Sequence, residues 1–322
     1  MTVSGEVPVQ VAFGSAGIGN RDPFISEADL NKLFATLDAH GVTRLDSAQI
    51  YGVSEKRLGE VHAGDRFTID TKWGNPTGFA PGNTTPWATQ AYVLQSAQES
   101  IARLNVKQVD VFYLHFPDAN TPLAETLAGV DAAYRLGLFR RFGLSNYDAA
   151  GVQAIYDHAK AHGYVLPTVY QGNYNPVTRK GETDLFPTLR RLGIAFFAYS
   201  PLAGGLLTKT AQQFHDGAGR FQKGSIFHNL YNKPAYVDSL AQWEAAAQAA
   251  GVSRAELAYR WVAWNSILRG EHGDSLIVGA STQEQLAETL GWIAHGPLDD
   301  AAVARIDKVW AGVAAATKDE AK

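Results

Sequence analysis

Short apolar runs rich in β-branched and aromatic residues recur along this chain, and stretches with helical spacing separate them. The runs lie at residues 43–46, 67–72, 109–115, 140–146, 168–171, 194–200 and 275–281. Strands that alternate with helices are typical of a parallel sheet buried on both faces. With one more strand expected before residue 43, about eight strands would close a barrel. The pattern predicts an α/β protein whose residues 1–322 form one (β/α)8 TIM barrel domain.

The regular alternation breaks after Tyr199. Residues 200–234 are rich in glycine and only weakly periodic. A loop of this length in a compact domain is usually functional or mobile, so we predict a long flap over a ligand. Additional helices are expected from about Tyr236, from Ser253 and over residues 299–316, the last of them on the outside of the barrel.

Polar residues close, or directly follow, most of the apolar runs. They are Asp46, Lys72, His115, Asn146, Gln171 and Tyr199. The carboxyl ends of barrel strands meet on one face, where (β/α)8 enzymes build their active sites. Packing alone gives core strands no reason to end this way. We therefore expect these side chains to converge on one mouth, and we expect an enzyme.

Composition narrows the possible partners. Hydrophobic residues make up 46% of the chain and charged residues 19%, which is ordinary for a globular protein. A net charge of −4 and the lack of a basic stretch argue against nucleic acid. The chain has no cysteine, no long apolar segment and no secretory signal at its start. We expect a cytoplasmic protein that acts on small molecules, without a membrane partner.

The stretch from Gly41 to Gly59 carries a family resemblance. It has a glycine, an aspartate ending a strand, a small residue and alanine, then tyrosine-glycine and a glutamate before leucine-glycine. This pattern resembles the signature of the aldo-keto reductases. The segments GLSN, YQGNYN, AYSPLAGGLL and IVGAS follow in the family's order, and GGLL, GRF and GASTQEQL look most like its aflatoxin-aldehyde reductase branch. The resemblance implies that NADPH reduces an aldehyde or a ketone to an alcohol.

The resemblance also implies a catalytic tetrad of Asp46, Tyr51, Lys72 and His115. Reducing a carbonyl group requires a proton donor at its oxygen, and tyrosine, with a pKa near 10, is a poor donor unaided. A lysine ammonium beside the phenol stabilises the phenolate. Asp46 would hold Lys72 charged and oriented, while His115 would donate to the carbonyl oxygen or orient the substrate.

Cofactor contacts are implied in the same way. Tyr199 would stack on the nicotinamide, and Ser145, Asn146 and Gln171 would hold its carboxamide. Further implied contacts are Ser200, Leu202, Gly204, Lys209, Arg220, Gly279, Ser281 and Gln285.

The cations and the helix start among these residues suit the 2′-phosphate of NADPH. Arg220 is favoured because Lys209 is displaced from the branch's pattern. Gly279 stands where many family members have a phosphate-binding lysine, although the branch shares this glycine. Thr289 replaces an asparagine usually near the adenine. Trp73, Phe116 and the flap are candidate walls of the substrate pocket.

Other motifs point elsewhere. Residues 14–19 have the spacing GxxGxG, not the GxGxxG of a Rossmann fold. Tyr156 and Lys160 have the spacing of a short-chain dehydrogenase pair, but we place them in mid-helix on a solvated face. His158 and His162 lie one helical turn apart without the HExxH pattern, so we read them as exposed and expect no metal site. A short-chain dehydrogenase therefore stays a minor alternative.

An alternative from another functional class shares the same fold. Potassium-channel β subunits bind NADPH as regulatory or sensor proteins, and such proteins can keep the tetrad while turning over slowly. Steady-state turnover of an ordinary aldehyde would separate the two functions.

Overall fold

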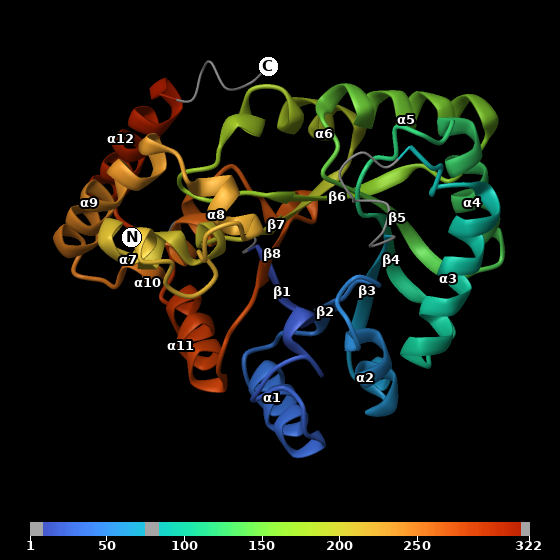
Figure 1. Cartoon of the computed structure of the whole chain (residues 1–322), viewed down its shortest axis with the longest axis horizontal. Coiled ribbons are helices and arrows are strands. Elements are labelled where there is room, and N and C mark those ends of the chain that lie inside the picture. The colour runs from blue at the N-terminus through green and yellow to red at the C-terminus, as the bar shows by residue number, and fades with distance from the viewer. Residues whose placement is uncertain (1–8, 75–83, 317–322) are drawn as a thin grey trace.

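The computed structural model describes residues 9–74 and 84–316. Eight parallel strands follow one another around a closed barrel, and β8 pairs with β1 to complete it (Figure 1). The strands are β1 (Gln10–Gly14), β2 (Arg44–Asp46), β3 (Thr68–Trp73), β4 (Val109–Leu114), β5 (Phe139–Ser145), β6 (Pro167–Asn173), β7 (Ala195–Tyr199) and β8 (Ser275–Val278). The predicted (β/α)8 barrel is confirmed.

Helices surround the barrel. They are α1 (Glu27–Ala39), α2 (Ser54–Glu60), α3 (Gln90–Leu104), α4 (Leu123–Arg135), α5 (Ala149–His162), α6 (Leu185–Leu192), α9 (Pro234–Ala249), α10 (Arg254–Arg260), α11 (Gln283–Ala294) and α12 (Asp300–Ala316). The predicted outer helices are present, and α12 packs along α9 (Figure 1). Within residues 9–74 and 84–316, no helix combines the length and apolar character needed to cross a membrane.

Side-chain caps explain several helix starts. Helix α3 begins at Gln90, because the Thr89 side chain just before it accepts a hydrogen bond from the Tyr92 amide. A threonine in this role satisfies an amide that the helix itself leaves unpaired. Asp148 caps α5 in the same way, because its side chain accepts a hydrogen bond from the Gly151 amide.

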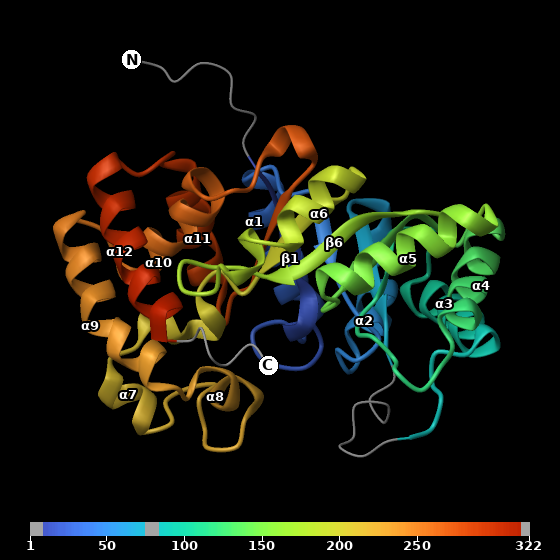
Figure 2. The same cartoon turned by 90° about the horizontal axis from the view of Figure 1, so that it is seen from above.

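The flap contains more regular structure than its sequence pattern indicates. It folds into the 3₁₀ segment η4 (Ala203–Thr208), α7 (Ala211–His215) and α8 (Ile226–Tyr231). In Figure 2, α8 lies below the ring of helices, whereas α7 lies beside α9 and contacts it. Thr210 and Gln213 form a capping box at the start of α7. Helices of 5 and 6 residues are too short to produce a visible hydrophobic period.

Alternation along the strands decides which side chains enter the barrel. On β4, Phe112 and Leu114 face the helices, whereas Val111 and Tyr113 belong to a separate cluster inside the barrel. The Tyr113 ring fits there because Gly143 lies beside it: a β-carbon at Gly143 would come within 2.3 Å of the ring. This alternation carries the polar residues at the strand ends into the mouth.

Candidate active site

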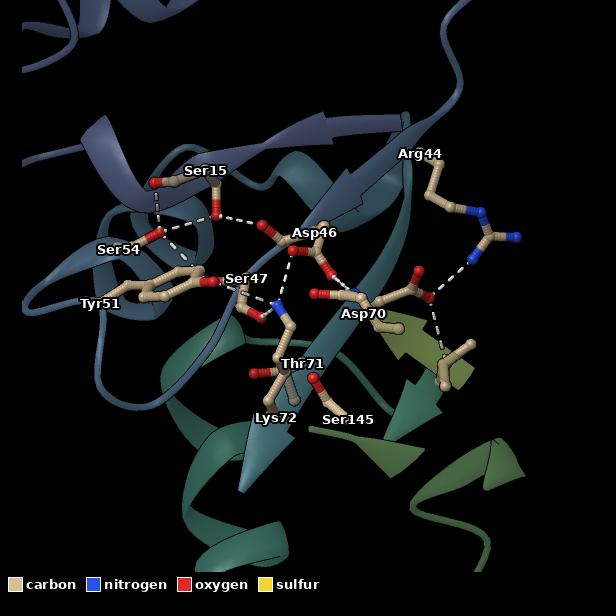
Figure 3. A network of polar contacts seen from close by, with 12 residues as sticks. Ser15, Arg44, Asp46, Ser47, Tyr51, Ser54, Asp70, Thr71, Lys72 and Ser145 are labelled. Carbon is tan, nitrogen blue, oxygen red and sulfur yellow. Dashed lines mark hydrogen bonds and ion pairs between the residues drawn. The ribbon is translucent and has the colours of Figure 1, made fainter. Parts of the chain in front are cut away.

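Lys72 lies at the centre of a polar network at the carboxyl ends of β2 and β3 (Figure 3). Its side chain is fully buried, and Nζ donates hydrogen bonds to Asp46 Oδ2 at 2.6 Å and to the Ser47 carbonyl oxygen at 2.8 Å. Tyr51 Oη lies 3.5 Å from the same nitrogen. Burial acts to lower the pKa of Lys72, but Asp46 and Tyr51 more than offset this and raise it. The ammonium therefore stays charged.

Asp46 is held on both of its carboxylate oxygens. Oδ2 binds Lys72, and Oδ1 accepts a hydrogen bond of 2.8 Å from Gln171 Nε2. The Asp46 carbonyl oxygen accepts a bond of 3.0 Å from Ser15 Oγ, whose hydroxyl also contacts Ser54 Oγ at 2.9 Å. This support fixes the position of the carboxylate.

Tyr51 lies in the turn between β2 and α2, with its hydroxyl beside Lys72. Lys72 Nζ lies 4.9 Å from the centre of the phenol ring, and the His115 ring meets the same ring edge-on at 6.1 Å. Burial raises the pKa of Tyr51, Lys72 acts to lower it, and Asp46 raises it further, so the net direction is upward. The phenol therefore carries its proton at neutral pH.

His115 directly follows β4 and is 7% exposed. Its ring stacks on Phe116 with 4.5 Å between the ring centres. Within the described part of the chain, Nδ1 is buried without a hydrogen-bond partner. Burial and then the charge of Lys72 hold the pKa of His115 well below its ordinary value. The imidazole is neutral at neutral pH.

A second group of predicted residues meets at the ends of β5 and β7. Tyr199 Oη donates to Asn146 Oδ1 at 2.8 Å, and Asn146 Nδ2 donates to the His115 carbonyl oxygen at 2.9 Å and to Ser145 Oγ at 3.0 Å. Asn146 and Ser200 have φ of 63° and 56°, which non-glycine residues seldom adopt. Such strained positions often occur at functional sites.

The structure brings Asp46, Tyr51, Lys72 and His115 close to Asn146, Gln171 and Tyr199, so the predicted convergence on one mouth is present. Gln171 lies within β6, which continues to Asn173, so it does not close its strand. Phe116 lies against His115, whereas Trp73 is fully buried and stacks on Trp87 with 4.6 Å between the ring centres. Substrate contacts of Trp73 and Phe116 stay predictions.

The remaining cofactor candidates lie in the flap and in the turn after β8. Leu202 directly precedes η4, and Gly204 has a φ of 69°. Lys209 is half-buried, and its carbonyl oxygen accepts a hydrogen bond of 3.1 Å from Arg254. Arg220 is exposed, 5.4 Å from the centre of the Phe227 ring.

In the turn after β8, Gly279 is exposed and has open space around it. The Ser281 amide donates to Gln285 Oε1 at 3.0 Å. Thr289 is buried on the following helix, α11. The cofactor roles of all these residues stay predictions.

Some supporting residues were not expected. The Ser47 carbonyl oxygen accepts a hydrogen bond from Lys72, and the Ser15 hydroxyl links the Asp46 carbonyl oxygen to the Ser54 hydroxyl. Ser47 and Ser54 lie inside the recognised motif. Ser15 follows β1 directly, so its place at a strand end could have identified it.

The other motifs occupy structural positions. Residues 14–19 connect β1 to the segment before α1. Lys160 is exposed, but Tyr156 packs against the core, so the expectation of a fully solvated pair was wrong. His158 is half-buried where exposure was expected, because its ring stacks on His162 with 4.0 Å between the ring centres. Across the described ranges, no three His, Asp or Glu residues gather as a metal site would require.

Comparison with known proteins shows the family of this chain. Residues 10–311 match the model of the Aldo/keto reductase family. The chain belongs to this family. Oxidoreductase sirO of Leptosphaeria maculans is 38% identical over 93% of this chain and 93% of its own length. Human aflatoxin B1 aldehyde reductase member 2 is 40% identical over 84% of this chain and 78% of its own.

Human aflatoxin B1 aldehyde reductase member 4 is 37% identical to this aldo/keto reductase over 92% of both chains. The predicted likeness to the aflatoxin-aldehyde reductase branch is thereby confirmed. An oxidoreductase that acts on small carbonyl compounds follows from membership of the family.

Proposed function

We propose that this aldo/keto reductase uses NADPH to reduce aldehydes, and also ketones, to alcohols, with Tyr51 as the general acid. The observation that carries the proposal is the chain of contacts from Tyr51 Oη to Lys72 Nζ to Asp46 Oδ2, at 3.5 and 2.6 Å. Relatives named aflatoxin B1 aldehyde reductases support the choice of aldehydes as substrates.

Tyr51 has the protonation state that an acid requires. Its raised pKa keeps the proton on Oη until negative charge develops on a carbonyl oxygen beside it. The proton then moves from Tyr51 Oη to that oxygen, and the charged Lys72 stabilises the phenolate left behind. Asp46, fixed on both oxygens, keeps the ammonium in place during this step.

The neutral His115 serves as a hydrogen-bond donor to the carbonyl oxygen. Because its pKa lies well below the ordinary value, a neutral ring with a single N–H faces the substrate throughout the neutral range. This polarises and orients the carbonyl group without competing with Tyr51 as the proton source.

NADPH, when bound, supplies the hydride. The residues present suit it: Ser200, Gly204 and Gly205 all have positive φ, so the backbone after β7 bends tightly as a cradle for a ligand. Ser145, Asn146, Gln171 and Tyr199 would hold the nicotinamide end. Within the described residues Arg220 has no carboxylate partner, so its charge is available for a phosphate group together with Ser281 and Gln285.

The test is consumption of NADPH, followed by absorbance, with a panel of aldehydes that includes short semialdehydes and dialdehydes. We expect steady-state turnover, and a Michaelis constant for NADPH at least tenfold below that for NADH. The Arg220→Ala variant should lose most of this preference. Tight cofactor binding without turnover of any aldehyde would contradict the proposal and favour a sensor.

A further inference from the structure

Arg21 connects the segment after the first strand, β1, to the turn after the last strand, β8. It lies between β1 and α1, and its Nη2 donates a hydrogen bond of 2.9 Å to the carbonyl oxygen of Ala280. Ala280 stands in the turn between β8 and α11, beside Gly279 and Ser281. A half-buried guanidinium therefore reaches this turn from the far end of the sequence.

A second arginine approaches the same place from the flap. The pKa of Arg21 is lowered, first by burial and then by the positive charge of Arg220. Among the described residues, no carboxylate lies within ion-pair distance of either guanidinium. Two nearby cations without a counter-charge repel each other, and an anion between them would remove that cost.

The surroundings of the turn also suit an anion. The turn leads into α11, a helix of 12 residues whose first amides attract negative charge. Beside Gly279, no atom lies within 4 Å of the position that a β-carbon would take. The turn therefore has room for a ligand beside Gly279, and Arg21 holds the carbonyl oxygen of the next residue, Ala280.

Arg21 has donors left over after its structural bond. Only Nη2 is engaged, by the Ala280 carbonyl oxygen, and Nε is buried close to Gly17. The remaining N–H groups of a guanidinium fork can bind two oxygens of one phosphate group.

We propose that Arg21 is a second phosphate-binding arginine, which grips the 2′-phosphate of NADPH opposite Arg220. This inference rests on the proposed use of NADPH. It adds to that function a residue that determines cofactor specificity, supplied by the segment between β1 and α1.

The structural alternative is that Arg21 merely ties two loops together. Arg57 provides a matched control, because it also braces the segment before α1: its Nη2 donates to the Ile25 carbonyl oxygen at 2.8 Å, and it pairs with Glu60. Its ion pair is satisfied within α2, so it has no unpaired charge to offer a cofactor.

The experiment measures cofactor binding without a carbonyl substrate, by quenching of intrinsic tryptophan fluorescence. In Arg21→Ala we expect the Kd for NADPH to rise by about tenfold to a hundredfold and the Kd for NADH to change by less than about threefold. Binding of 2′,5′-ADP should weaken in parallel with NADPH. Arg57→Ala should leave the ratio of the two Kd values unchanged, and Arg21→Lys should recover part of it.

The outcomes separate the two proposals. A wild type that binds NADPH and NADH equally would refute the cofactor choice and this inference together. A wild type that prefers NADPH, with an Arg21→Ala variant that keeps the same preference, would overturn only the role of Arg21. An equal rise in the Kd for NADPH and the Kd for NADH would mean that Arg21 has a structural role or contacts the pyrophosphate. Either result would also overturn its role at the 2′-phosphate. Arg21→Lys provides the same comparison if the alanine variant does not fold.

Discussion

Two networks of charged residues lie inside this barrel, at different depths. The outer network at the mouth joins Asp46, Lys72 and Tyr51. The inner network lies deeper, where Arg44 Nη1 contacts Asp70 Oδ1 at 2.6 Å and Asp110 Oδ2 at 2.7 Å. Arg141 Nη2 reaches the same Asp110 oxygen at 2.6 Å. Figure 3 shows Lys72 bonded to Asp46 and Asp70 bonded to Arg44, so these two residues of one strand have different charged partners.

The two networks differ in what is left unsatisfied. In the outer network both Asp46 oxygens are engaged, and Tyr51 keeps its proton for use. In the inner network Asp70 Oδ2 has no partner in the described part of the chain. Burial raises the pKa of Asp70 to about 7, against the opposing charge of Arg44. On β3, we therefore propose a catalytic role for Lys72 and a structural role for the carboxyl group of Asp70.

The largest expected effect is on the outer network alone. Tyr51→Phe removes the proton donor and keeps the shape of the ring, so turnover should fall by roughly two to four orders of magnitude. The Kd for NADPH and the unfolding free energy should stay nearly unchanged. Steady-state kinetics and fluorescence binding give both values. Retention of more than about a tenth of wild-type turnover would mean that Tyr51 is not the acid.

Breaking the inner network should act on stability instead. Arg44→Met removes the partner shared by Asp70 and Asp110, and the unfolding free energy should fall by about 3 kcal/mol. Urea unfolding measures this, and kcat should stay within about threefold of wild type. Lys56→Met is the control, because its pair with Glu60 is exposed and should contribute at most about 1 kcal/mol. A loss of activity without a loss of stability would reverse the assignment of the two networks.

The pH dependence of stability sharpens the comparison further. The folded-state pKa of Asp70 is about 7, whereas its ordinary value is 3.8. The folded protein therefore holds a proton that the unfolded chain releases, so this contribution is full below about pH 4 and is lost as the pH rises towards 7. Between about pH 5 and 7 the loss is on the order of 2 kcal/mol.

Asp70→Asn should flatten this dependence. The charged groups that face Asp70 are Arg44, Asp46 and Asp110, and all of them remain in the variant. Urea unfolding across the pH range checks the slope. An unchanged slope would show that another group is responsible.

His115 should have a smaller effect than Tyr51. His115→Ala removes a neutral donor, and kcat/KM for small aldehydes should fall by about tenfold. Because the pKa of His115 lies well below its ordinary value, the pH–rate profile of the wild type should show no histidine step near neutrality. His115→Gln, which keeps an N–H donor, should recover part of the rate; an equal loss in both variants would argue against hydrogen bonding as its role.

The smallest expected effect is at Tyr156. This residue packs on the core from α5, away from the outer network, so Tyr156→Phe should leave turnover within about twofold of wild type. Steady-state kinetics with the best aldehyde checks this. A collapse of turnover would revive the Tyr-x-x-x-Lys alternative.

The sequence predicted the barrel and the convergence of the tetrad because both follow from local pattern. Period-two alternation carries the last inward residue of each strand into the mouth, and the motif around Asp46 and Tyr51 predicts the chemistry. The support from the Ser47 carbonyl oxygen could not be predicted, because it depends on the path of the backbone. Asp70 could have been found, since it has the same inward parity as Lys72. The contact from Arg21 to Ala280 could not be predicted, because the two residues lie far apart in the sequence and no local pattern connects them.

The pairing of β1 with β8 also bears on how the protein is made. β1 pairs with β2 early in the chain, but its second partner, β8, comes near the end, so the barrel cannot close until nearly all of the chain has left the ribosome. Two hydrogen bonds stabilise the contact between the first and the last part of the chain. Arg21 donates to the Ala280 carbonyl oxygen, and Gln283 donates to the Asp29 carbonyl oxygen. A ligand that contacts both the segment after β1 and the turn after β8 would bind only the closed barrel, and so would favour closure. Cofactor supply during synthesis should then raise the yield of folded protein.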